Sequence, residues 1–491
     1  MERQSIIHEV KKKDIFDIVV IGGGASGLGT ALDAVSRGLS VLLVEKYDFG
    51  KGTSSKATKL LHGGVRYLAQ GDISLVIEAL HERKTILKNA PHLARTQEFI
   101  IPFYDRWQGY YYLMGLKFYD LLSFKSSLGD SKMLSKKETL ALLPNLKKEG
   151  LKGGISYFDG QFDDARLCID LVHTIIQAGG FCLNYTSFEG YHVDESGISN
   201  IHLTDHLTGQ DYTIQTKCIV NAAGVHADDI IDKSGVEKNF SITPAKGSHL
   251  IIDKKFLSSD VAIMIPKTSD GRVLFIIPWH GVSIIGTTDI ATKDKSFDPV
   301  VSDEEITFML HNAAAYFENA PTVNDIISKY SGLRPLVSSM EDQENSKDIS
   351  RKHKIVKSKS GFYSLLGGKW TTFRKMGQDT IDFLIKDLQW SAKKSNSENL
   401  PIIPPLNKNL GKPLHNLLPY SSDFFDYAIE NELVESVEDL LARRTRCLFI
   451  NKNATLEIAD EMINRIAIIK NKDVTWKINQ KNQFLHLANS Y

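Results

Sequence analysis

Three glycines near the start of the chain have the spacing of a dinucleotide-binding turn. Gly22, Gly24 and Gly27 follow a β-branched run at 17–21 and precede small and apolar residues at 28–36. The first glycine allows a tight turn, the second lets the backbone approach a pyrophosphate, and the third permits close packing of a helix on a strand. A helix that begins there stabilises the anion through its free N–H groups. The spacing therefore predicts a pyrophosphate site between a strand and a helix.

An acidic residue completes this pattern at the end of the next apolar run. Glu45 follows the apolar residues 40–44. Its carboxylate is placed to accept hydrogen bonds from an adenosine ribose with free hydroxyls. The pattern predicts FAD or NAD and does not by itself choose between them. Its place at the N-terminus, with no second such fingerprint, favours FAD, because an enzyme with a non-nicotinamide electron acceptor needs one dinucleotide site.

Further glycine-containing segments have the composition of ligand-facing loops. His62, Gly63 and Gly64 precede Arg66 and Tyr67, so that backbone can approach a flat ring while a cation and a phenol face a ligand. An ordinary surface loop is the alternative interpretation. The two other small-residue turns are Asn221-Ala222-Ala223-Gly224 and Gly367-Gly368-Lys369-Trp370-Thr371-Thr372.

The turn at 367–372 also has the composition of a helix N-terminus. Thr371 or Thr372 suits an N-cap position. A helix N-terminus aimed at a flavin would stabilise the negative charge of the reduced ring. We expect both roles together.

The elements that must position these residues are predicted from apolar spacing. Helices are predicted at 73–89 and 165–178, and a short strand at 218–221. Short β-rich runs separated by turns from 250 to 289 predict an antiparallel sheet. Residues 391–413 are rich in Lys, Ser, Asn and Pro and predict a linker. The C-terminal part beyond it is predicted to be helical, at 434–448 and 456–469.

Composition excludes several classes of protein. The 59 basic and 59 acidic residues cancel, which gives no electrostatic case for nucleic-acid binding. The four cysteines lack CxxC spacing, which argues against a disulfide scaffold, a zinc site or an iron–sulfur cluster, so we expect no metal. No apolar run reaches the roughly 20 residues of a spanning helix, and the N-terminal residues lack a signal-peptide core. We expect a soluble or membrane-surface protein in a reducing compartment.

Ten segments, read in chain order, form a recognisable set. They are GGGASGLGTALDAVSRG, GTSSKATKLLHGGVRYL, ALHERKTILKNAPHL, YFDGQFDDARL, NAAGVHADDI, KGSHLII, TSDGRVLFIIPW, IIGTTD, YSGLRPL and GGKWTTFRKM. Together they resemble the FAD-dependent glycerol-3-phosphate dehydrogenases, of the mitochondrial type and similar bacterial enzymes. The resemblance covers residues 15–385, and the tail segment LARRTRCLFI at 441–450 is similar to the C-terminal helical domain of that family.

The resemblance implies an α/β flavoprotein with a D-amino-acid-oxidase-like, Rossmann-like FAD-binding domain, an antiparallel substrate domain and a C-terminal helical domain. We expect the FAD-binding domain to be assembled from three segments and the substrate domain from two, before a linker and the helical domain. In that order the segments are 15–90, 155–240 and 330–388; 91–154 and 241–329; 389–413; and 414–491.

The substrate that the resemblance implies, sn-glycerol 3-phosphate, calls for cations and a base. Arg66, Arg334 and Lys369 lie in motifs that line the family's site, and a guanidinium matches phosphate oxygens. His249 is our first choice for the base that removes the C2 hydroxyl proton while hydride passes to the flavin. Tyr67 can hydrogen-bond the same region. Whether Arg334 or Lys369 assists the proton transfer instead stays open.

The resemblance also implies the residues around FAD. His62 lies where some related flavoproteins attach FAD covalently, but we expect non-covalent binding. Where some bacterial members have two serines, this chain has Ala57 and Thr58, so any serine contact there is lost or moved. The cofactor-binding residues that we expect are Gly22, Gly24, Gly27, Glu45, Thr53, Ser54, His62, Gly63, Gly64, Ala223, Gly224, Asp289, Gly368, Lys369 and Thr371.

The implied reaction is oxidation of sn-glycerol 3-phosphate to dihydroxyacetone phosphate, with electrons passed through FAD to a membrane quinone. A glycerol-3-phosphate oxidase, which uses O2 and makes H2O2, is the nearest alternative. A non-catalytic FAD-binding protein is a rival from another class, but it has no use for a phosphate pocket.

An aromatic-rich segment bears on the acceptor. Residues 99–124 include Trp107, Phe118 and the run 110–112, which suit either a membrane interface or a protein core. With the resemblance, they favour peripheral attachment to the cytoplasmic face of the membrane in a bacterial-type cell. The oligomeric state stays open, a homodimer being one alternative.

Overall fold

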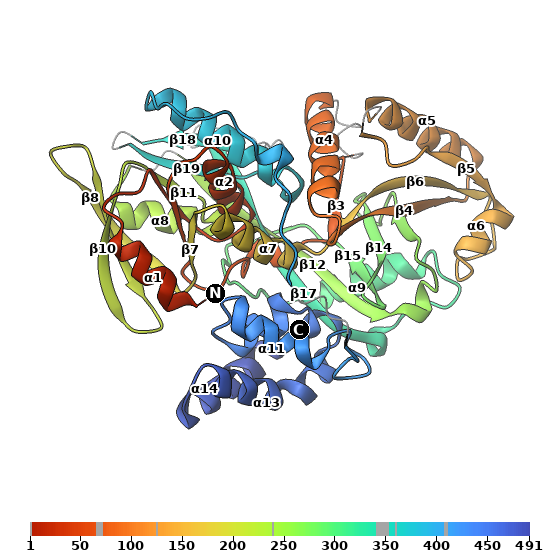
Figure 1. Cartoon of the computed structure of the whole chain (residues 1–491). Helices are drawn as coiled ribbons and strands as arrows, with labels where there is room; N and C mark the ends of the chain where they lie inside the picture. Colours follow the sequence, from red (N-terminus) through yellow and green to blue (C-terminus); the bar gives the residue numbers. More distant parts are fainter. Residues whose placement is uncertain are drawn as a thin grey trace.

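The glycine turn lies at the carboxyl end of the first strand of a six-stranded sheet, on the left of Figure 1. The strand order is β18-β19-β11-β1-β2-β7, with β18 antiparallel to β19 and the other pairs parallel. Four of these strands are buried along their length, as expected for a parallel sheet that is covered on both faces. The strands are β1 (Ile18–Ile21), β2 (Val41–Val44), β7 (Phe181–Leu183), β11 (Ile219–Asn221), β18 (Lys354–Lys357) and β19 (Phe362–Leu366).

Helices pack around this sheet, and a three-stranded ribbon extends from it. Helix α2 packs against both α10 and α7. The predicted strands and helices of this part are confirmed to within three residues at each end. The helices are α1 (Arg3–Lys12), α2 (Ala25–Ser36), α7 (Asp164–Gln177), α8 (Ala227–Ser234) and α10 (Phe373–Asp387); the ribbon is β8 (Thr186–Val193), β9 (Ser199–Asp205) and β10 (Gln210–Thr216).

A ten-stranded sheet forms the right-hand part of Figure 1. Its path is β16-β12-β15-β14-β13-β4-β6-β3, with β17 paired to β12 and β5 paired to β6. The antiparallel sheet predicted at 250–289 is confirmed by the pairing of β12, β13, β14 and β15. The strands are β3 (Leu60–Leu61), β4 (Ala94–Phe103), β5 (Lys132–Ser135), β6 (Gly153–Phe162), β12 (Phe240–Asp253), β13 (Ala262–Ile265), β14 (Leu274–Trp279), β15 (Val282–Gly286), β16 (Ile290–Ala291) and β17 (Ile326–Ser339); the helices are α4 (Ile73–Asn89), α5 (Arg106–Leu122), α6 (Lys136–Leu142) and α9 (Asp303–Ala314).

Two of the expected segment boundaries fall inside strands, and a third, at 240, falls on the first residue of β12. The boundary at 154 lies within β6, and the boundary at 329 lies within β17. Strand β6 pairs along its whole length with β4, and β17 pairs with β12 from 326 to 339. Neither position therefore divides two folded parts. A sequence pattern marks where a strand begins and ends, but not which sheet the strand joins.

The C-terminal helices, in blue, lie below the other two parts in Figure 1. They are α11 (Ser422–Asn431), α12 (Cys447–Ile450), α13 (Lys452–Ile469) and α14 (Val474–Ala488), with a π-helical turn at Asp439–Arg444. The single helix predicted at 434–448 is wrong, because this turn and α12 replace it. The local reason is that the arginines of the turn point into a buried ion cluster with Asp48, which apolar spacing does not reveal.

The structure describes residues 2–64, 72–123, 126–237, 240–339, 353–358, 361–406 and 411–491. Within them, no helix is both long and apolar enough to cross a bilayer. The predicted linker packs on the α/β part, where the Ser397 hydroxyl donates to Asp33 and the Ile402 N–H donates to the Asn89 carbonyl.

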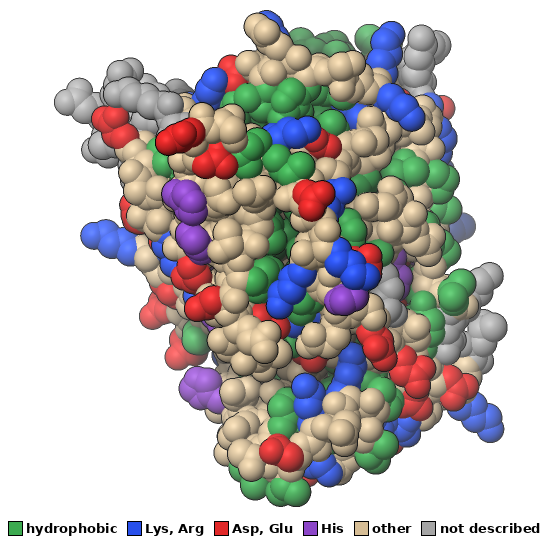
Figure 2. All heavy atoms as spheres, turned by 60° about the vertical axis from the view of Figure 1, so that its left-hand side comes forward, with side chains coloured by type: hydrophobic (Ala, Val, Ile, Leu, Met, Phe, Trp, Pro, Cys, Tyr) green, Lys and Arg blue, Asp and Glu red, His purple; other side chains and the backbone are tan. Residues whose placement is uncertain are grey.

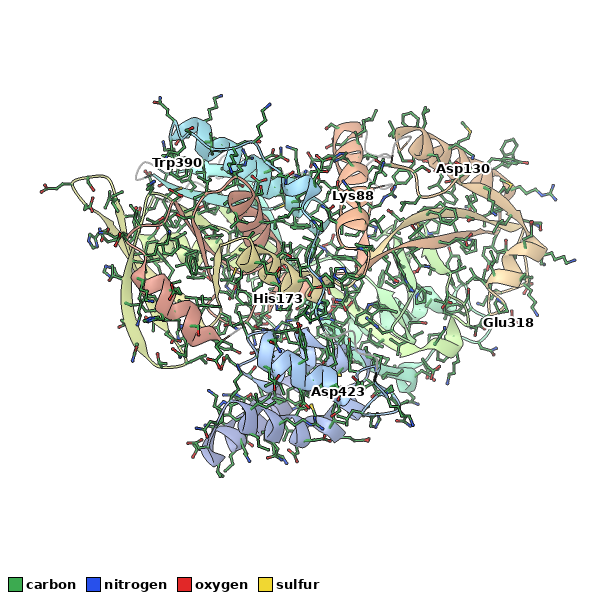
Figure 3. All side chains as sticks on the ribbon, viewed as in Figure 1. Lys88, Asp130, His173, Glu318, Trp390 and Asp423 are labelled. Atoms are coloured by element: carbon green, nitrogen blue, oxygen red, sulfur yellow. The ribbon has the colours of Figure 1, made fainter. Side chains whose placement is uncertain are left out.

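The three parts meet around α7. Figure 3 shows the His173 side chain of this helix near the middle of the view. On the outer face of the left-hand part, acidic and basic side chains are interspersed (Figure 2), in keeping with the balanced composition.

Candidate active site

Two adjoining cavities lie where the two sheets meet. The smaller, of about 130 Å³, follows the glycine turn. The larger, of about 310 Å³, lies between that turn and the ten-stranded sheet. The two cavities adjoin, because five residues line both of them. The shared residues are Thr53, Pro335, Gly368, Lys369 and Trp370.

The smaller cavity has the form of a pyrophosphate cradle. Gly22 has a φ of +113°, which favours glycine, and a Cβ there would fall 2.7 Å from the Ala222 carbonyl oxygen. At Gly27, a Cβ would fall 1.9 Å from the Gly22 carbonyl oxygen, so only glycine permits this approach of α2 to β1. Gly24 precedes the first residue of α2, whose N-terminus therefore opens at the cavity.

Glu45 lines the same cavity at the end of β2. Its two carboxylate oxygens accept hydrogen bonds from the Gly23 N–H (2.7 Å) and the Tyr47 N–H (2.9 Å). Burial raises the pKa of this carboxyl, and the two backbone N–H groups oppose that effect. Each carboxylate oxygen keeps a further lone pair for a ribose hydroxyl. The glycine cradle and this carboxylate fit the diphosphate and the adenosine ribose of FAD.

The other residues expected at the cofactor divide between the two cavities. Ala223 and Gly224 line the smaller one, and Ser54 lies there with its hydroxyl accepting from the Ala25 N–H (2.9 Å). Thr371 lines the larger one. Helix α10 begins after Thr372, so the predicted helix entry is confirmed, but neither threonine caps it through its side chain.

Asp289 lies away from the glycine turn. It lines the larger cavity, where its carboxylate pairs with Arg334 Nη1 at 3.0 Å. The Arg272 guanidinium donates to the Asp289 carbonyl at 2.8 Å. The structure therefore assigns Asp289 to the arginine side of the larger cavity and not to the pyrophosphate cradle.

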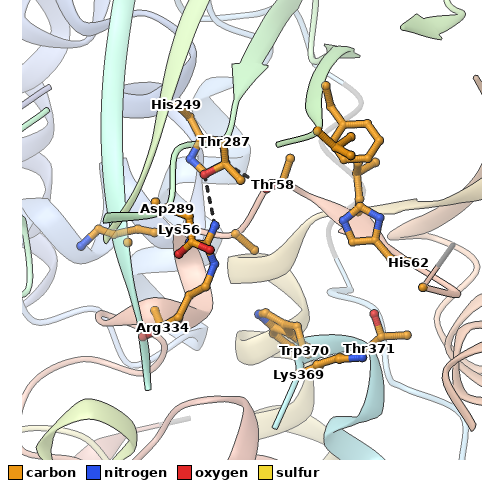
Figure 4. Close-up of a pocket in the computed structure, with 18 of the residues that line it drawn as sticks. Lys56, Thr58, His62, His249, Thr287, Asp289, Arg334, Lys369, Trp370 and Thr371 are labelled. Atoms are coloured by element: carbon orange, nitrogen blue, oxygen red, sulfur yellow. Dashed lines mark hydrogen bonds and ion pairs between the residues drawn. The ribbon is translucent and has the colours of Figure 1, made fainter. Parts of the chain in front are cut away.

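The larger cavity brings together the expected substrate residues that the structure describes. Figure 4 shows His249, Thr58, Thr287 and Arg334 on one side and His62 on the other, with Lys369 below. Arg334 Nη2 donates to the Thr287 hydroxyl at 3.2 Å. Arg66 and Tyr67 lie outside the described residues.

His249 is held in the wall of this cavity. Its ring is 1% exposed and stacks on Tyr330, with the ring centroids 4.6 Å apart. Burial, with Lys59 and Arg334 adding like charge, lowers the pKa of His249 well below its usual value. The shift favours the neutral imidazole, in which one ring nitrogen carries a lone pair.

The loop at 62–64, on the opposite side of the cavity from His249, is held by contacts with buried residues. Burial lowers the pKa of His62, whose ring lies 5.3 Å from that of Phe275. The Gly63 N–H donates to Asp159, which also pairs with Arg83 at 2.8 Å. A Cβ on Gly63 would fall 1.9 Å from the Tyr119 hydroxyl, so this glycine permits a close approach to α5.

Sequence reasoning did not single out several cavity residues. Arg272 brings a further guanidinium, and Lys56 pairs with Asp298 at 2.8 Å; the sequence marks Thr58 only as a departure from some bacterial members and does not reveal its contact with His249. All three lie within the recognised motifs TSDGRVLFIIPW and GTSSKATKLLHGGVRYL, which were the available signal. Motif order alone did not say which of their side chains face the cavity.

Comparison with known proteins gives a consistent assignment. The family described as "FAD dependent oxidoreductase" matches residues 17–372, and the family described as "C-terminal domain of alpha-glycerophosphate oxidase" matches residues 388–477. The mitochondrial glycerol-3-phosphate dehydrogenases of Bos taurus and Homo sapiens are each 33% identical over 549 aligned positions, covering 100% of this chain and 75% of theirs.

Solved structures agree with these sequence matches. The glycerol-3-phosphate dehydrogenase from Bacillus halodurans, complexed with FAD, is 27% identical with a TM-score of 0.80, covering 99% of this chain and 97% of that one. L-alpha-glycerophosphate oxidase from Mycoplasma pneumoniae shares the fold, at 17% identity and a TM-score of 0.62, covering 80% of this chain and 100% of that one. The fold is thus D-amino-acid-oxidase-like, with a C-terminal helical domain, and the cofactor is FAD.

Proposed function

This chain belongs to the family of FAD-dependent glycerol-3-phosphate dehydrogenases, and from that premise we propose that it oxidises sn-glycerol 3-phosphate to dihydroxyacetone phosphate. The observation that carries the proposal is the larger cavity, in which cationic side chains and a neutral histidine face one space beside the cofactor cradle. A small phosphorylated alcohol needs both kinds of group.

The phosphate dianion is bound by the cations of the larger cavity. Asp289 contacts both guanidinium groups, because its carboxylate pairs with Arg334 and its backbone carbonyl accepts from Arg272. Lys369 lines both cavities and can bridge substrate and cofactor. Guanidinium groups match phosphate oxygens in geometry and charge.

His249 accepts the proton of the C2 hydroxyl. A neutral imidazole has the lone pair that this step requires, and burial keeps it neutral. Arg334 and Lys369 remain cations in this assignment and stabilise the alkoxide that develops as the proton leaves. Bound FAD supplies the two-electron acceptor, while Glu45 and the glycine turn hold its adenosine ribose and diphosphate.

The electrons pass to a membrane quinone, and helix α5 supports this part of the proposal. Trp107, Tyr111 and Met114 are 82%, 71% and 74% exposed, and Phe118 and Leu121 extend the same helical stripe. The opposite side of α5 is buried at Gly109, Leu116 and Tyr119. The helix is thus apolar on its outer side as well as its inner one.

A membrane surface with anionic head groups suits this stripe. Lys117 is exposed on the same helix, and Lys132, Lys136 and Lys137 are exposed in the β5 and α6 segment that follows it in the chain. Apolar side chains beside cations are typical of segments that lie in a membrane interface. We therefore place the protein at the cytoplasmic face of a membrane, attached peripherally through α5.

An oxidase is the second candidate. The match of residues 388–477 to the C-terminal domain of alpha-glycerophosphate oxidase favours it. The substrate half-reaction would be the same, but O2 would accept the electrons and H2O2 would form. The two candidates differ only in how the reduced protein is reoxidised.

Anaerobic titration of the purified protein tests the first half-reaction. sn-Glycerol 3-phosphate should bleach the flavin absorbance rapidly, whereas glycerol should do so much more slowly and glycerol 2-phosphate should not. Flavin released from the protein should be FAD and not FMN, because Glu45 is placed for an adenosine ribose. Failure of the substrate to bleach a fully loaded protein would contradict the proposal.

Reoxidation then separates the two candidates. Reduced protein is mixed with a short-chain quinone without oxygen, or with oxygenated buffer alone. Fast reoxidation by the quinone is expected. Faster reoxidation in oxygenated buffer, with one H2O2 formed for each flavin, would identify an oxidase.

A further inference from the structure

The ring of His249 is held on one face and at one edge. It stacks on Tyr330 with an interplanar angle of 14°. A Cβ on Gly286 would fall 2.2 Å from its Cδ2, so the neighbouring strand leaves no room at that edge. Sliding and tilting of the ring are therefore restricted. These contacts do not determine which way the ring nitrogens point or what they hydrogen-bond to.

One side-chain hydroxyl provides that hydrogen bond. Thr58 Oγ1 lies 2.9 Å from His249 Nε2, and both residues line the larger cavity. Within the described part of the chain, His249 Nδ1 is buried without a hydrogen-bond partner. A hydroxyl can donate to a bare ring nitrogen and accept from a protonated one. Thr58 can therefore hold the ring both before and after the ring takes a proton.

The loop that carries Thr58 is clamped from two other parts of the molecule. Asp164 at the start of α7 accepts from the Ala57 N–H (2.9 Å) and from Lys59 Nζ (2.7 Å). Lys59 has a φ of +63°, which is uncommon for a residue with a side chain. Such a conformation persists where surrounding contacts enforce it. The position of Thr58 is thus determined by its neighbours on both sides.

The C-terminal helices supply the second clamp. Arg446 Nη2 donates to the Ser55 carbonyl at 2.8 Å, and Lys59 Nζ donates to the same oxygen at 2.8 Å. The Tyr330 hydroxyl donates to the Ala57 carbonyl at 2.9 Å, which joins the loop to the ring that stacks on His249. The histidine and the threonine therefore share one rigid support.

We propose that Thr58 links His249 to the substrate: its hydroxyl passes its own proton to His249 Nε2 while its oxygen takes the proton of the C2 hydroxyl. The inference rests on the proposed function, which assigns the proton to His249. Thr58 itself neither gains nor loses a proton overall.

The role of the Thr58 hydroxyl is tested by replacing Thr58 with valine, which has nearly the same shape but no hydroxyl. In Thr58→Val, the rate constant for flavin reduction at saturating sn-glycerol 3-phosphate should fall at least about tenfold, because a buried hydrogen bond to the base is lost. The substrate Kd from the same stopped-flow traces should change by less than about threefold. Thr58→Ser keeps a hydroxyl and should recover most of the lost rate. Thr455→Val is the matched control, since it removes a buried threonine hydroxyl in α13 away from both cavities.

A double-mutant cycle shows whether Thr58 acts through His249. In the His249→Gln background, Thr58→Val should change the reduction rate by less than about twofold, because the partner is already absent. An undiminished effect in that background would overturn the proposal. Failure of Thr58→Ser to improve on Thr58→Val would also overturn it, since the methyl group and not the hydroxyl would then matter.

A measurement without substrate keeps this test separate from that of the proposed function. In protein with 15N-labelled histidine side chains, the His249 signals are identified by their loss in His249→Gln. Thr58→Val should shift them, while Thr58→Ser and Thr455→Val should leave them in place. Unshifted signals in Thr58→Val would contradict the Thr58–His249 contact even if the protein did not oxidise sn-glycerol 3-phosphate.

Discussion

At the scale of single residues, burial and pairing determine which side chain suits which role. His249 and Arg334 line the same cavity, yet one is a buried neutral ring and the other a partly exposed cation. The two environments separate a proton acceptor from an anion-binding group, which is the division of labour that oxidation of a phosphorylated alcohol requires.

Arg334 is expected to act on the phosphate. Arg334→Ala removes a fork of charged donors, and hydrogen bonds to charged groups contribute about 1.5–3 kcal/mol each. The kcat/KM for sn-glycerol 3-phosphate should therefore fall at least about tenfold. Unphosphorylated glycerol is the control substrate, and its much slower oxidation should be almost unchanged. Equal losses for both substrates would mean that Arg334 supports the fold or the proton transfer instead.

At the scale of elements, helix α5 has apolar side chains both on the side that packs against the protein and on the side exposed to solvent. Tyr112 and Leu113 pack against the core that α5 shares with the C-terminal helices, whereas Trp107, Tyr111 and Met114 face outwards. The aromatic segment is therefore partly core and partly exposed. Tyr112 belongs to the inner side and is unsuitable for a test of the outer one.

The outer stripe of α5 is expected to govern membrane attachment. The variant Trp107→Ser, Tyr111→Ser, Met114→Ser removes three exposed apolar side chains and should weaken co-sedimentation with vesicles that contain anionic lipid. Reduction of a membrane quinone should fall with it, while activity with a soluble dye should stay close to that of the parent protein. Tyr112→Ser, on the inner side, should instead lower stability. A loss of dye activity in the triple variant would mean that the stripe supports the fold.

At the scale of the whole molecule, buried ion pairs join the C-terminal helices to the cofactor-binding part. Asp48 follows β2 and pairs with Arg443 (2.5 Å) and with Arg444. The two guanidinium groups hold the pKa of Asp48 below its usual value, against the effect of burial. A second contact between these parts involves Lys59, Asp164 and Arg446 and is also buried. Burial lowers the pKa of Lys59 to about 7, and Asp164 opposes that shift.

The ion cluster at Asp48 is expected to contribute strongly to stability. Arg444→Ala leaves a buried carboxylate short of a partner, which typically costs about 3–5 kcal/mol. The matched control is Arg465→Ala, which breaks a partly exposed pair with Asp426 and should cost less than about 1 kcal/mol. Denaturant unfolding of both variants gives the comparison. Similar small losses would show that the C-terminal helices are held mainly by apolar contacts.

The sequence by itself determined the local units of this protein. The strand, glycine turn, helix and terminal acid at 17–45 were predictable, because each depends on spacing over a few residues. Motif order also brought His249, Arg334 and Lys369 forward as candidates. Only the tertiary structure decided which of these share a cavity, that Asp289 pairs with Arg334, and that Thr58 contacts His249 across 191 positions of chain. Such contacts depend on how sheets and buried charges meet in space, and no short-range pattern records that.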